Sequence, residues 1–441
     1  MVKALFKNLL ISLKGILKWL LMSFIVGILV GLVMSGFDVA VEYVTHIRSA
    51  NQYLIWFLPL AGLFIVFVYR KCGLEDVSTS TVIVAIREQK KKISLKLAPL
   101  ILAATVLTHL FGGSTGREGA ALQFGGSVGN HFARRLKMKP SNSLILMMAA
   151  MSASFSALFG TPLAAAIFPM EFVSIGVIYY AALVPCVLSS FVANSVVHYF
   201  GLRTLGNPYL ITGLPSIYSP MFLKTILIGI LCALVGILFC EVMYYGHEFA
   251  KKAFPNSYVR VLVGGVAIVL LTLLIGSQTY NGLSSELITR SFEGTAPGPA
   301  FLLKMLFTVL TLGFGFKGGE IVPTFVIGST FGCFIAGVLG VPAELGAACC
   351  MCGVFCAVTN CPIASLMIAF ELFGFEGMAY FAIVVAISYM LSGYGGLYNT
   401  QKIVYSKYEP RFVNKTVREY FAHEFVDKAH LKEKKGDKEK S

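Results

Sequence analysis

Long apolar runs dominate this sequence, and they constrain its fold more than any other feature. The longest cover residues 19–46, 53–69, 178–200, 221–246, 260–276, 300–314 and 378–392. A helix needs roughly 20 apolar residues to cross the hydrocarbon core of a bilayer. The runs are continuously apolar, whereas the strands of a membrane barrel alternate apolar and polar residues. The sequence therefore predicts an all-α polytopic membrane protein.

The charged residues agree with this interpretation. Only 13% of the residues are charged, against about 25% in a typical soluble domain. The net charge of +14 would suggest nucleic acid binding in a soluble protein. Here the basic residues lie at the ends of the apolar runs and in the tails, where positive-inside topology places them. We expect the lipid bilayer of the plasma (cell inner) membrane as the partner, and no nucleic acid.

The two ends of the chain differ from its apolar body. The first 18 residues place four lysines within about 60° of one helical face, which predicts an amphipathic helix on the membrane surface or, alternatively, a signal anchor. Membrane half one is expected over 19–205 and membrane half two over 216–408. Residues 409–441 then form a basic tail that we expect on the cytoplasmic side.

Shorter apolar pieces, interrupted by Gly and Pro, lie between the long runs. They cover 97–111, 118–132, 143–159, 162–175, 321–340, 342–358 and 362–374. Broken helices at membrane depth occur where they are buried in protein or line a cavity. They are a common indicator of a transporter's binding site.

The chain also contains an internal repeat. At an offset of 200 residues, Pro162 matches Pro362 and Glu171 matches Glu371; at an offset of 203, the glycine at 116 matches the one at 319. Two halves that share one plan are typical of transporters with a site near the membrane midplane.

A glycine-rich turn over 112–119 leads into one of the short helices and contains Glu118. Free backbone N–H groups at a helix start form a ready anion site. A carboxylate in that turn can occupy the place of the anion itself. The alternative is that these glycines serve close helix packing.

Four motifs in order carry a resemblance to a known family. They are GSTGREGA at 113–120, TPLA at 161–164, KGGEIVP at 317–323 and GLY at 396–398. Together they resemble the CLC anion channels and anion/proton antiporters. The resemblance implies an inverted repeat of two halves, broken helices around a midplane anion site, about eighteen membrane helices and a homodimer.

The resemblance also implies roles for individual residues. Glu118 matches the gating glutamate, and Tyr398 matches a tyrosine whose hydroxyl donates to the anion, although without the motif it would be an interfacial aromatic residue. Ile321 and Val322 match positions whose backbone amides face the anion. The first anion loop corresponds to Ser78, Thr79 and Ser80, whose hydroxyls are candidate anion donors or a helix cap.

Two positions differ from the chloride members of the family. Phe172 stands where proton-coupled chloride members carry an internal glutamate, and it cannot carry a proton. Glu320 stands where chloride members have an apolar residue, and the sequence around it is similar to the fluoride/proton antiporter branch. Glu320 is therefore a candidate proton carrier, with helix capping as the alternative.

Other conspicuous residues have structural interpretations. Glu171 and Glu371 are expected to make buried hydrogen bonds, His109 to be a packing histidine, and Arg117 to pair with a carboxylate. The ten cysteines fit packing better than a metal site, and no cofactor is predicted.

These observations favour a fluoride/proton antiporter that exports fluoride, with a halide anion and the proton as its ligands. A chloride channel or a chloride/proton antiporter is the alternative. An intramembrane enzyme is a remote one, because the sequence contains neither HExxH nor GxSxG.

Overall fold

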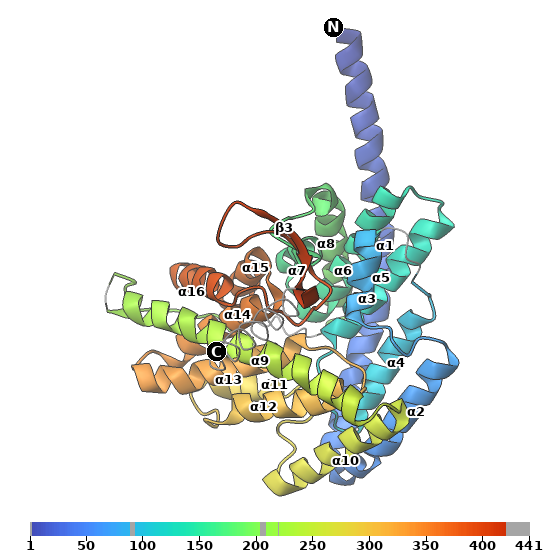
Figure 1. The fold of residues 1–441 in the computed structure, drawn as a ribbon. Coiled ribbons are helices and arrows are strands. Elements are labelled where there is room, and N and C mark those ends of the chain that lie inside the picture. The colour runs from blue at the N-terminus through green and yellow to red at the C-terminus, as the bar shows by residue number, and fades with distance from the viewer. Residues whose placement is uncertain (1, 89–92, 203–208, 219, 420–441) are drawn as a thin grey trace, which may run out of the picture.

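The computed structural model describes residues 2–88, 93–202, 209–218 and 220–419. Sixteen α-helices lie in this part of the chain (Figure 1). In the first half they are α1 (Val2–Ala50), α2 (Leu58–Lys71), α3 (Thr79–Glu88), α4 (Leu97–Leu110), α5 (Glu118–Arg135), α6 (Pro140–Phe159), α7 (Pro162–Glu171) and α8 (Leu183–Tyr199). In the second they are α9 (Met221–Ala253), α10 (Ser257–Ile275), α11 (Ser285–Phe292), α12 (Ala300–Thr308), α13 (Ile321–Leu339), α14 (Ala343–Thr359), α15 (Pro362–Phe373) and α16 (Met378–Leu391).

Seven helical stretches are apolar and long enough to cross a membrane, as the composition predicts. They are Gly15–Ala50, Gln52–Lys71, Pro140–Phe159, Tyr180–Tyr199, Met221–Ala253, Ser257–Ile275 and Ile321–Leu339. Two of the pieces predicted to be short, 143–159 and 321–340, thus belong to helices of spanning length. Conversely, the run 300–314 divides into α12 and a π-helical turn over Val309–Gly313, and α16 has only 14 residues.

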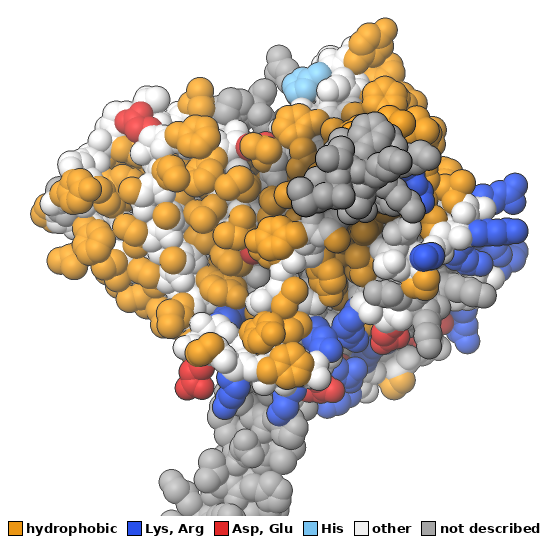
Figure 2. Space-filling model, turned by 90° about the horizontal axis from the view of Figure 1, so that it is seen from above, with side chains coloured by type: hydrophobic (Ala, Val, Ile, Leu, Met, Phe, Trp, Pro, Cys, Tyr) orange, Lys and Arg blue, Asp and Glu red, His pale blue; other side chains and the backbone are white. Residues whose placement is uncertain are grey.

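The surface of the molecule carries the expected separation of side chains. Figure 2 shows hydrophobic side chains over most of the visible face, with Lys and Arg gathered along its lower and right-hand borders. Such an apolar belt suits lipid contact, and the basic border suits the headgroup region.

The two halves interlock at the ends of their repeat-related helices. The carboxylate of Glu171, at the end of α7, accepts hydrogen bonds from the first backbone amides of α15, those of Ile363 (3.1 Å) and Ala364 (2.8 Å). Glu371 in α15 does the same for Leu163 (2.9 Å) and Ala164 (2.8 Å) at the start of α7. A carboxylate satisfies amides that have no partner inside the helix. The predicted structural role of the two glutamates is confirmed.

The break before each of these helices has a local cause. Gly160 and Asn360 end α6 and α14 in the left-handed conformation (φ 70° and 59°). Pro162 and Pro362 then occupy the first helical position, where the absence of an N–H costs no hydrogen bond. A left-handed cap followed by proline stops one helix and starts the next in both halves.

Aromatic rings fill the space between the halves. Phe168 packs against both members of the repeat pair Phe155 and Phe355, with ring centroids 5.0 and 5.7 Å apart. Phe325 of α13 continues the cluster against Phe355 at 5.0 Å. Ring packing of this kind adds to the free energy gained by burial.

Two parts of the fold differ from the sequence prediction. The structure is not entirely helical, because β1 (Ser174–Ile175) pairs in parallel with β2 (Lys402–Tyr405), which pairs antiparallel with β3 (Phe412–Thr416). At the other end, the predicted surface helix over 1–18 is the first part of the continuous helix α1, which projects from the body in Figure 1. Its position on a membrane surface stays a prediction. The tail predicted from residue 409 begins with β3, and residues 420–441 lie outside the described part.

Candidate functional site

The two glycine-rich turns, 203 residues apart in the chain, meet in the middle of the molecule. The amide of Gly116 donates to the carbonyl of Gly319 (2.6 Å), and the amide of Gly319 donates to the carbonyl of Gly116 (2.7 Å). The hydroxyl of Thr115 also donates to the Gly319 carbonyl (2.9 Å). This pairing brings the starts of α5 and α13 together.

Only glycine permits this approach. A Cβ atom on Gly319 would meet the backbone of Gly119 at the start of α5, and one on Gly119 would lie 2.8 Å from the Cα of Gly319. Real side chains do not come so close to backbone atoms. The packing interpretation of these glycines and the anion-site interpretation are therefore compatible, because close packing is what places the two helix starts side by side.

Glu118 is the first residue of α5, and its side chain is completely buried at this junction. One carboxylate oxygen accepts a hydrogen bond from the amide of Arg117 (3.0 Å), and the other has no hydrogen-bond partner among the described residues. The amide of Val322, in the first turn of α13, faces this carboxylate. Ile321 and Val322 are both completely buried there. The carboxylate thus takes the position that an anion would take between two helix starts.

Arg117 forms an ion pair with Asp38 of α1, and its Nε lies 3.7 Å from the Glu118 carboxylate. The predicted pairing of Arg117 with a carboxylate is confirmed. His109 is completely buried, in keeping with the predicted packing role, and its two ring nitrogens lie 2.8 and 3.1 Å from the carbonyl oxygens of Thr105 and Thr115, to one of which a neutral imidazole can donate.

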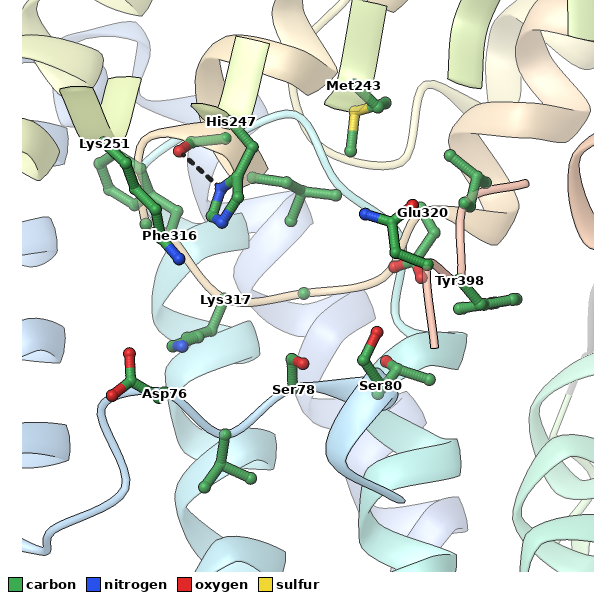
Figure 3. Close-up of a pocket in the computed structure, with 18 of the residues that line it drawn as sticks. Asp76, Ser78, Ser80, Met243, His247, Lys251, Phe316, Lys317, Glu320 and Tyr398 are labelled. Atoms are coloured by element: carbon green, nitrogen blue, oxygen red, sulfur yellow. Dashed lines mark hydrogen bonds between the residues drawn. The ribbon is translucent and has the colours of Figure 1, made fainter. Parts of the chain in front are cut away.

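Glu320 precedes α13 as its N-terminal cap residue, but its side chain makes no capping hydrogen bond. The carboxylate instead lies against Gly119 and beside the hydroxyl of Tyr398. Figure 3 shows Glu320 and Tyr398 together on one side of a cavity. The capping alternative for Glu320 is therefore not supported by the contacts of its side chain.

The cavity has a volume of about 360 Å³ and collects most of the predicted site residues. Ser78, Thr79, Ser80, Glu320 and Tyr398 all line its wall. The Tyr398 hydroxyl is buried and makes no hydrogen bond of good geometry among the described residues, although the Glu320 carboxylate lies beside it. It is a donor that a bound anion would satisfy.

The remaining predicted residues do not line this cavity. Glu118, Ile321 and Val322 are completely buried at the paired glycines. Ser78 and Thr79 also belong to the start of α3, where the amide of Ser78 donates to the hydroxyl of Thr81 (3.2 Å). The oxygen of this capping bond belongs to Thr81, which is not one of the residues that line the cavity.

Several charged residues that line the cavity were not singled out from the sequence. Arg260 lines the cavity, and Asp76, His247, Lys251 and Lys317 lie toward its opposite side from Glu320 (Figure 3). The ammonium of Lys317 packs 4.5 Å from the ring centroid of Tyr69. His247 offered a signal, because an ionisable residue within a long apolar helix favours a functional position. A wall with this many charges is suited to water and small ions.

Phe172 is completely buried and does not itself line the cavity. Its ring packs edge-on against Tyr398, with centroids 5.1 Å apart, and stacks on Phe168 at 5.2 Å. No titratable group stands at this position. A proton that reaches Glu118 from this side therefore needs another carrier.

The cysteines contribute packing in this structure. All ten are free thiols, and all except Cys72 are buried. Among the described residues, no three metal-ligating side chains come together.

Comparisons with known proteins agree with this geometry. The sequence profile described as voltage gated chloride channel matches residues 61–393. The chloride/fluoride channel protein of Pseudomonas syringae pv. tomato is 34% identical over 400 residues, which are 89% of this chain and 88% of that protein. An H(+)/Cl(−) exchange transporter of Vibrio cholerae is 26% identical over 391 residues, 80% of this chain and 81% of that one.

Solved structures show the same architecture. The crystal structure of a CLC-type fluoride/proton antiporter superimposes with a TM-score of 0.83 at 34% identity, covering 88% of this chain and 98% of that one. A slow cyanobacterial Cl−/H+ antiporter superimposes with a TM-score of 0.74 at 15% identity, covering 85% and 94%. The second likeness concerns the fold alone.

Proposed function

This chain belongs to the voltage-gated chloride channel (CLC) family, and on that premise we propose that it is a fluoride/proton antiporter that exports fluoride from the cell. The observation that carries the proposal is the pair of carboxylates, Glu118 and Glu320, at two helix starts joined by the Gly116–Gly319 pairing. The similarity to a fluoride/proton antiporter over most of both chains supports the choice of ion.

In the proposed exchange, the Glu118 carboxylate and the transported anion compete for one binding position. The ionised Glu118 carboxylate occupies the place between the helix starts of α5 and α13, where backbone amides favour negative charge. Once protonated, it no longer competes with an anion for those amides. An anion then enters from the cavity, where the Tyr398 hydroxyl and the side chains of Ser78 and Ser80 are donors.

Glu320 is the proposed proton carrier on the inner side, a role that the Phe172 side chain cannot perform. Its carboxylate lies between the water-accessible cavity and the start of α5. A second negative charge there disfavours a resident anion unless it is neutralised by a proton. Protonation of Glu320 and occupancy by an anion would therefore be linked, with the proton arriving from Glu118 and leaving into the cavity while the anion moves in the opposite direction.

A passive chloride channel, or a chloride/proton antiporter, is the second candidate. The observation that favours the channel is Phe172, because its packing against Tyr398 leaves no titratable group at that position. The names of the relatives describe channels and transporters, so no enzymatic reaction is proposed.

The deciding experiment is efflux from proteoliposomes. Vesicles loaded with fluoride or chloride are given a voltage step, while ion-selective electrodes record the anion and a pH electrode records protons. We expect fluoride efflux faster than chloride efflux, with protons moving in the opposite direction and uphill when driven by the anion gradient. Anion efflux without proton movement would overturn the antiporter in favour of the channel.

The family resemblance also supports a homodimer with one anion pathway per subunit, in the plasma membrane with the basic tail in the cytoplasm. The surface formed by α8 and α16 is our proposed interface. It carries exposed apolar side chains, including Phe191 (43% exposed) and Leu391 (49%).

A further inference from the structure

Two cations are buried near the paired glycine-rich turns but away from the cavity described above. Arg48 lies in the last turn of α1 and is 6% exposed, and Lys304 of α12 is completely buried. The guanidinium of Arg48 donates to the carbonyl of His109 (2.9 Å). The ammonium of Lys304 donates to the carbonyl of Gly282 (2.8 Å) and the hydroxyl of Ser284 (2.9 Å).

These hydrogen bonds satisfy N–H donors of both side chains but do not neutralise their positive charges. All the acceptors are neutral oxygens, and within the described part of the chain neither cation has a carboxylate in ion-pair range. Both cations lie at Gly282: its carbonyl accepts from Lys304, and the Arg48 guanidinium occupies the place where a Cβ would stand. A buried charge without a counter-charge is costly, and in membrane proteins such residues mark ion pathways.

A second cavity, of about 610 Å³, opens beside these cations. Arg48 lines it, together with the polar side chains of Gln52, Thr279 and Ser284. Ser284 is the residue whose hydroxyl also contacts Lys304. Glu286 lines the wall as well and is exposed.

The two cavities lie at opposite ends of one spanning helix. Ser257 at the start of α10 lines the first cavity, and Thr272 and Leu273 near its end line the second. With a rise of about 1.5 Å per residue, the ends of a helix of this length are roughly 27 Å apart, close to the thickness of the hydrocarbon core. Because α10 is long and apolar enough to cross a membrane, we infer that the two cavities face opposite sides of it.

A short chain of contacts joins the second cavity to the gating carboxylate. The Arg48 guanidinium donates to the His109 carbonyl, and the His109 ring lies 3.1 Å from the Thr115 carbonyl. The Thr115 hydroxyl in turn donates to the carbonyl of Gly319, beside Glu118. The second cavity is thus next to the turn that carries Glu118.

We propose that the second cavity is a binding site for a small inorganic anion, with Arg48 and Lys304 as its source of positive potential. The anion is the counter-charge that the two buried cations lack. This anion site does not depend on the proposed fluoride/proton exchange, because binding an anion there requires no proton transport. In an antiporter or in a channel, it would bind the anion on the side of Glu118 opposite to the first cavity.

Crystals of the full-length protein soaked in a series of bromide concentrations test the proposal by anomalous diffraction. Two isosteric changes on the cavity wall leave the buried cations untouched: Gln52→Glu adds a negative charge, and Glu286→Gln removes one. We expect a bromide peak beside the Arg48 guanidinium. The half-saturating bromide concentration should rise roughly three- to tenfold in Gln52→Glu and fall in Glu286→Gln, because the added or removed charge acts on the anion at short range.

Arg48→Gln is the direct variant and should abolish this peak. If it does not fold, the two wall variants still decide the question. No bromide peak beside Arg48 at any concentration, or equal affinity in Gln52→Glu, wild type and Glu286→Gln, would overturn the proposal. Because the readout is binding, this outcome is independent of whether protons are transported.

Discussion

Glu118 and Glu320 occupy similar but unequal places in the two halves. Glu118 is the first residue of α5, whereas Glu320 is one position earlier relative to α13. The glycine turns are equivalent, so this shift of one residue directs one carboxylate to the junction and the other to the cavity. An inverted repeat therefore produces two different chemical positions from one backbone plan.

Glu118→Gln should abolish proton-coupled transport. The amide has nearly the shape of the carboxyl group but cannot release a proton at physiological pH. Anion flux should persist without coupling or stop altogether, as measured by simultaneous fluoride and pH electrodes on proteoliposomes. Uphill proton movement in this variant would remove Glu118 from the mechanism.

Glu320→Gln should impair fluoride/proton exchange while the protein remains folded and dimeric. Its side chain makes no capping bond, so the substitution costs no helix cap. Thr324→Ala is a matched control, because the Thr324 hydroxyl bonds only to the backbone carbonyl of Glu320 (2.8 Å) and carries no titratable group. Wild-type coupling in Glu320→Gln would make Glu320 structural and favour a different proton route.

At the scale of elements, reciprocal carboxylate caps hold the short helices α7 and α15 together. Each helix begins with proline after a left-handed cap, so neither can continue the preceding helix. Its first amides lie where the two halves meet and have no acceptor within their own helix. The other half supplies the acceptor in both cases, which makes these helices stable only in the assembled fold.

Glu171→Gln should therefore lower the stability of the protein by about 1–2 kcal/mol, since an amide oxygen is a weaker acceptor than a carboxylate. Glu371→Gln should cost less, because the Glu371 side chain is partly exposed, whereas Glu171 is only 5% exposed. Thermal unfolding in detergent measures both. A larger loss of stability in Glu371→Gln than in Glu171→Gln would contradict the proposed role of burial at these two caps.

The segment after α16 is held by Lys407, which lies in the loop between β2 and β3, outside the spanning helices. Its ammonium donates to the side chain of Asn360 and to the carbonyl of Tyr389 (2.9 Å), so it ties this loop to the ends of α14 and α16. Burial lowers the pKa of the Lys407 ammonium to about 8, from 10.5.

Stability should consequently depend on pH through Lys407. Between pH 8 and 10.5 the unfolded chain holds the proton that the folded chain has lost, so the free energy of unfolding rises with pH across this window. The melting temperature of wild type relative to Lys407→Met should increase as the pH rises above 8. A difference that stays constant with pH would show that Lys407 keeps its ordinary pKa.

At the scale of the whole molecule, the proposed dimer follows from where apolar surface is left uncovered. α7 and α15 contact each other across the halves, and α8 and α16 flank them. Exposed apolar side chains on this surface can meet either lipid or a second subunit. The family resemblance favours the second subunit.

Light scattering in detergent should therefore give the mass of two chains. Introducing a charge at the proposed interface, as in Leu391→Lys, should yield monomers, because an unpaired charge in an apolar interface is costly. Leu274→Lys is the control: Leu274 lies near the end of α10, away from that surface, and is 84% exposed. A dimer that persists in Leu391→Lys would show that the interface lies elsewhere. A fully active monomer would contradict the proposed dimer.

The sequence determined the features that depend on local composition and spacing. Most of the long apolar runs predict spanning helices from composition alone, and Pro162 and Pro362 each prevent the preceding helix from continuing. The repeat at offsets of 200 and 203 also located both glycine turns and Glu118.

Only the tertiary structure decided what depends on contacts between distant segments. The Gly116–Gly319 pairing, the cavity beside Glu320 and the meeting of Arg48 with Lys304 each join residues from different helices. The two-residue strand β1 has no periodicity to detect and exists because β2 lies beside it. A chain specifies its helices locally because their backbone bonds are local, whereas sites and cavities arise from packing that no short stretch of sequence contains.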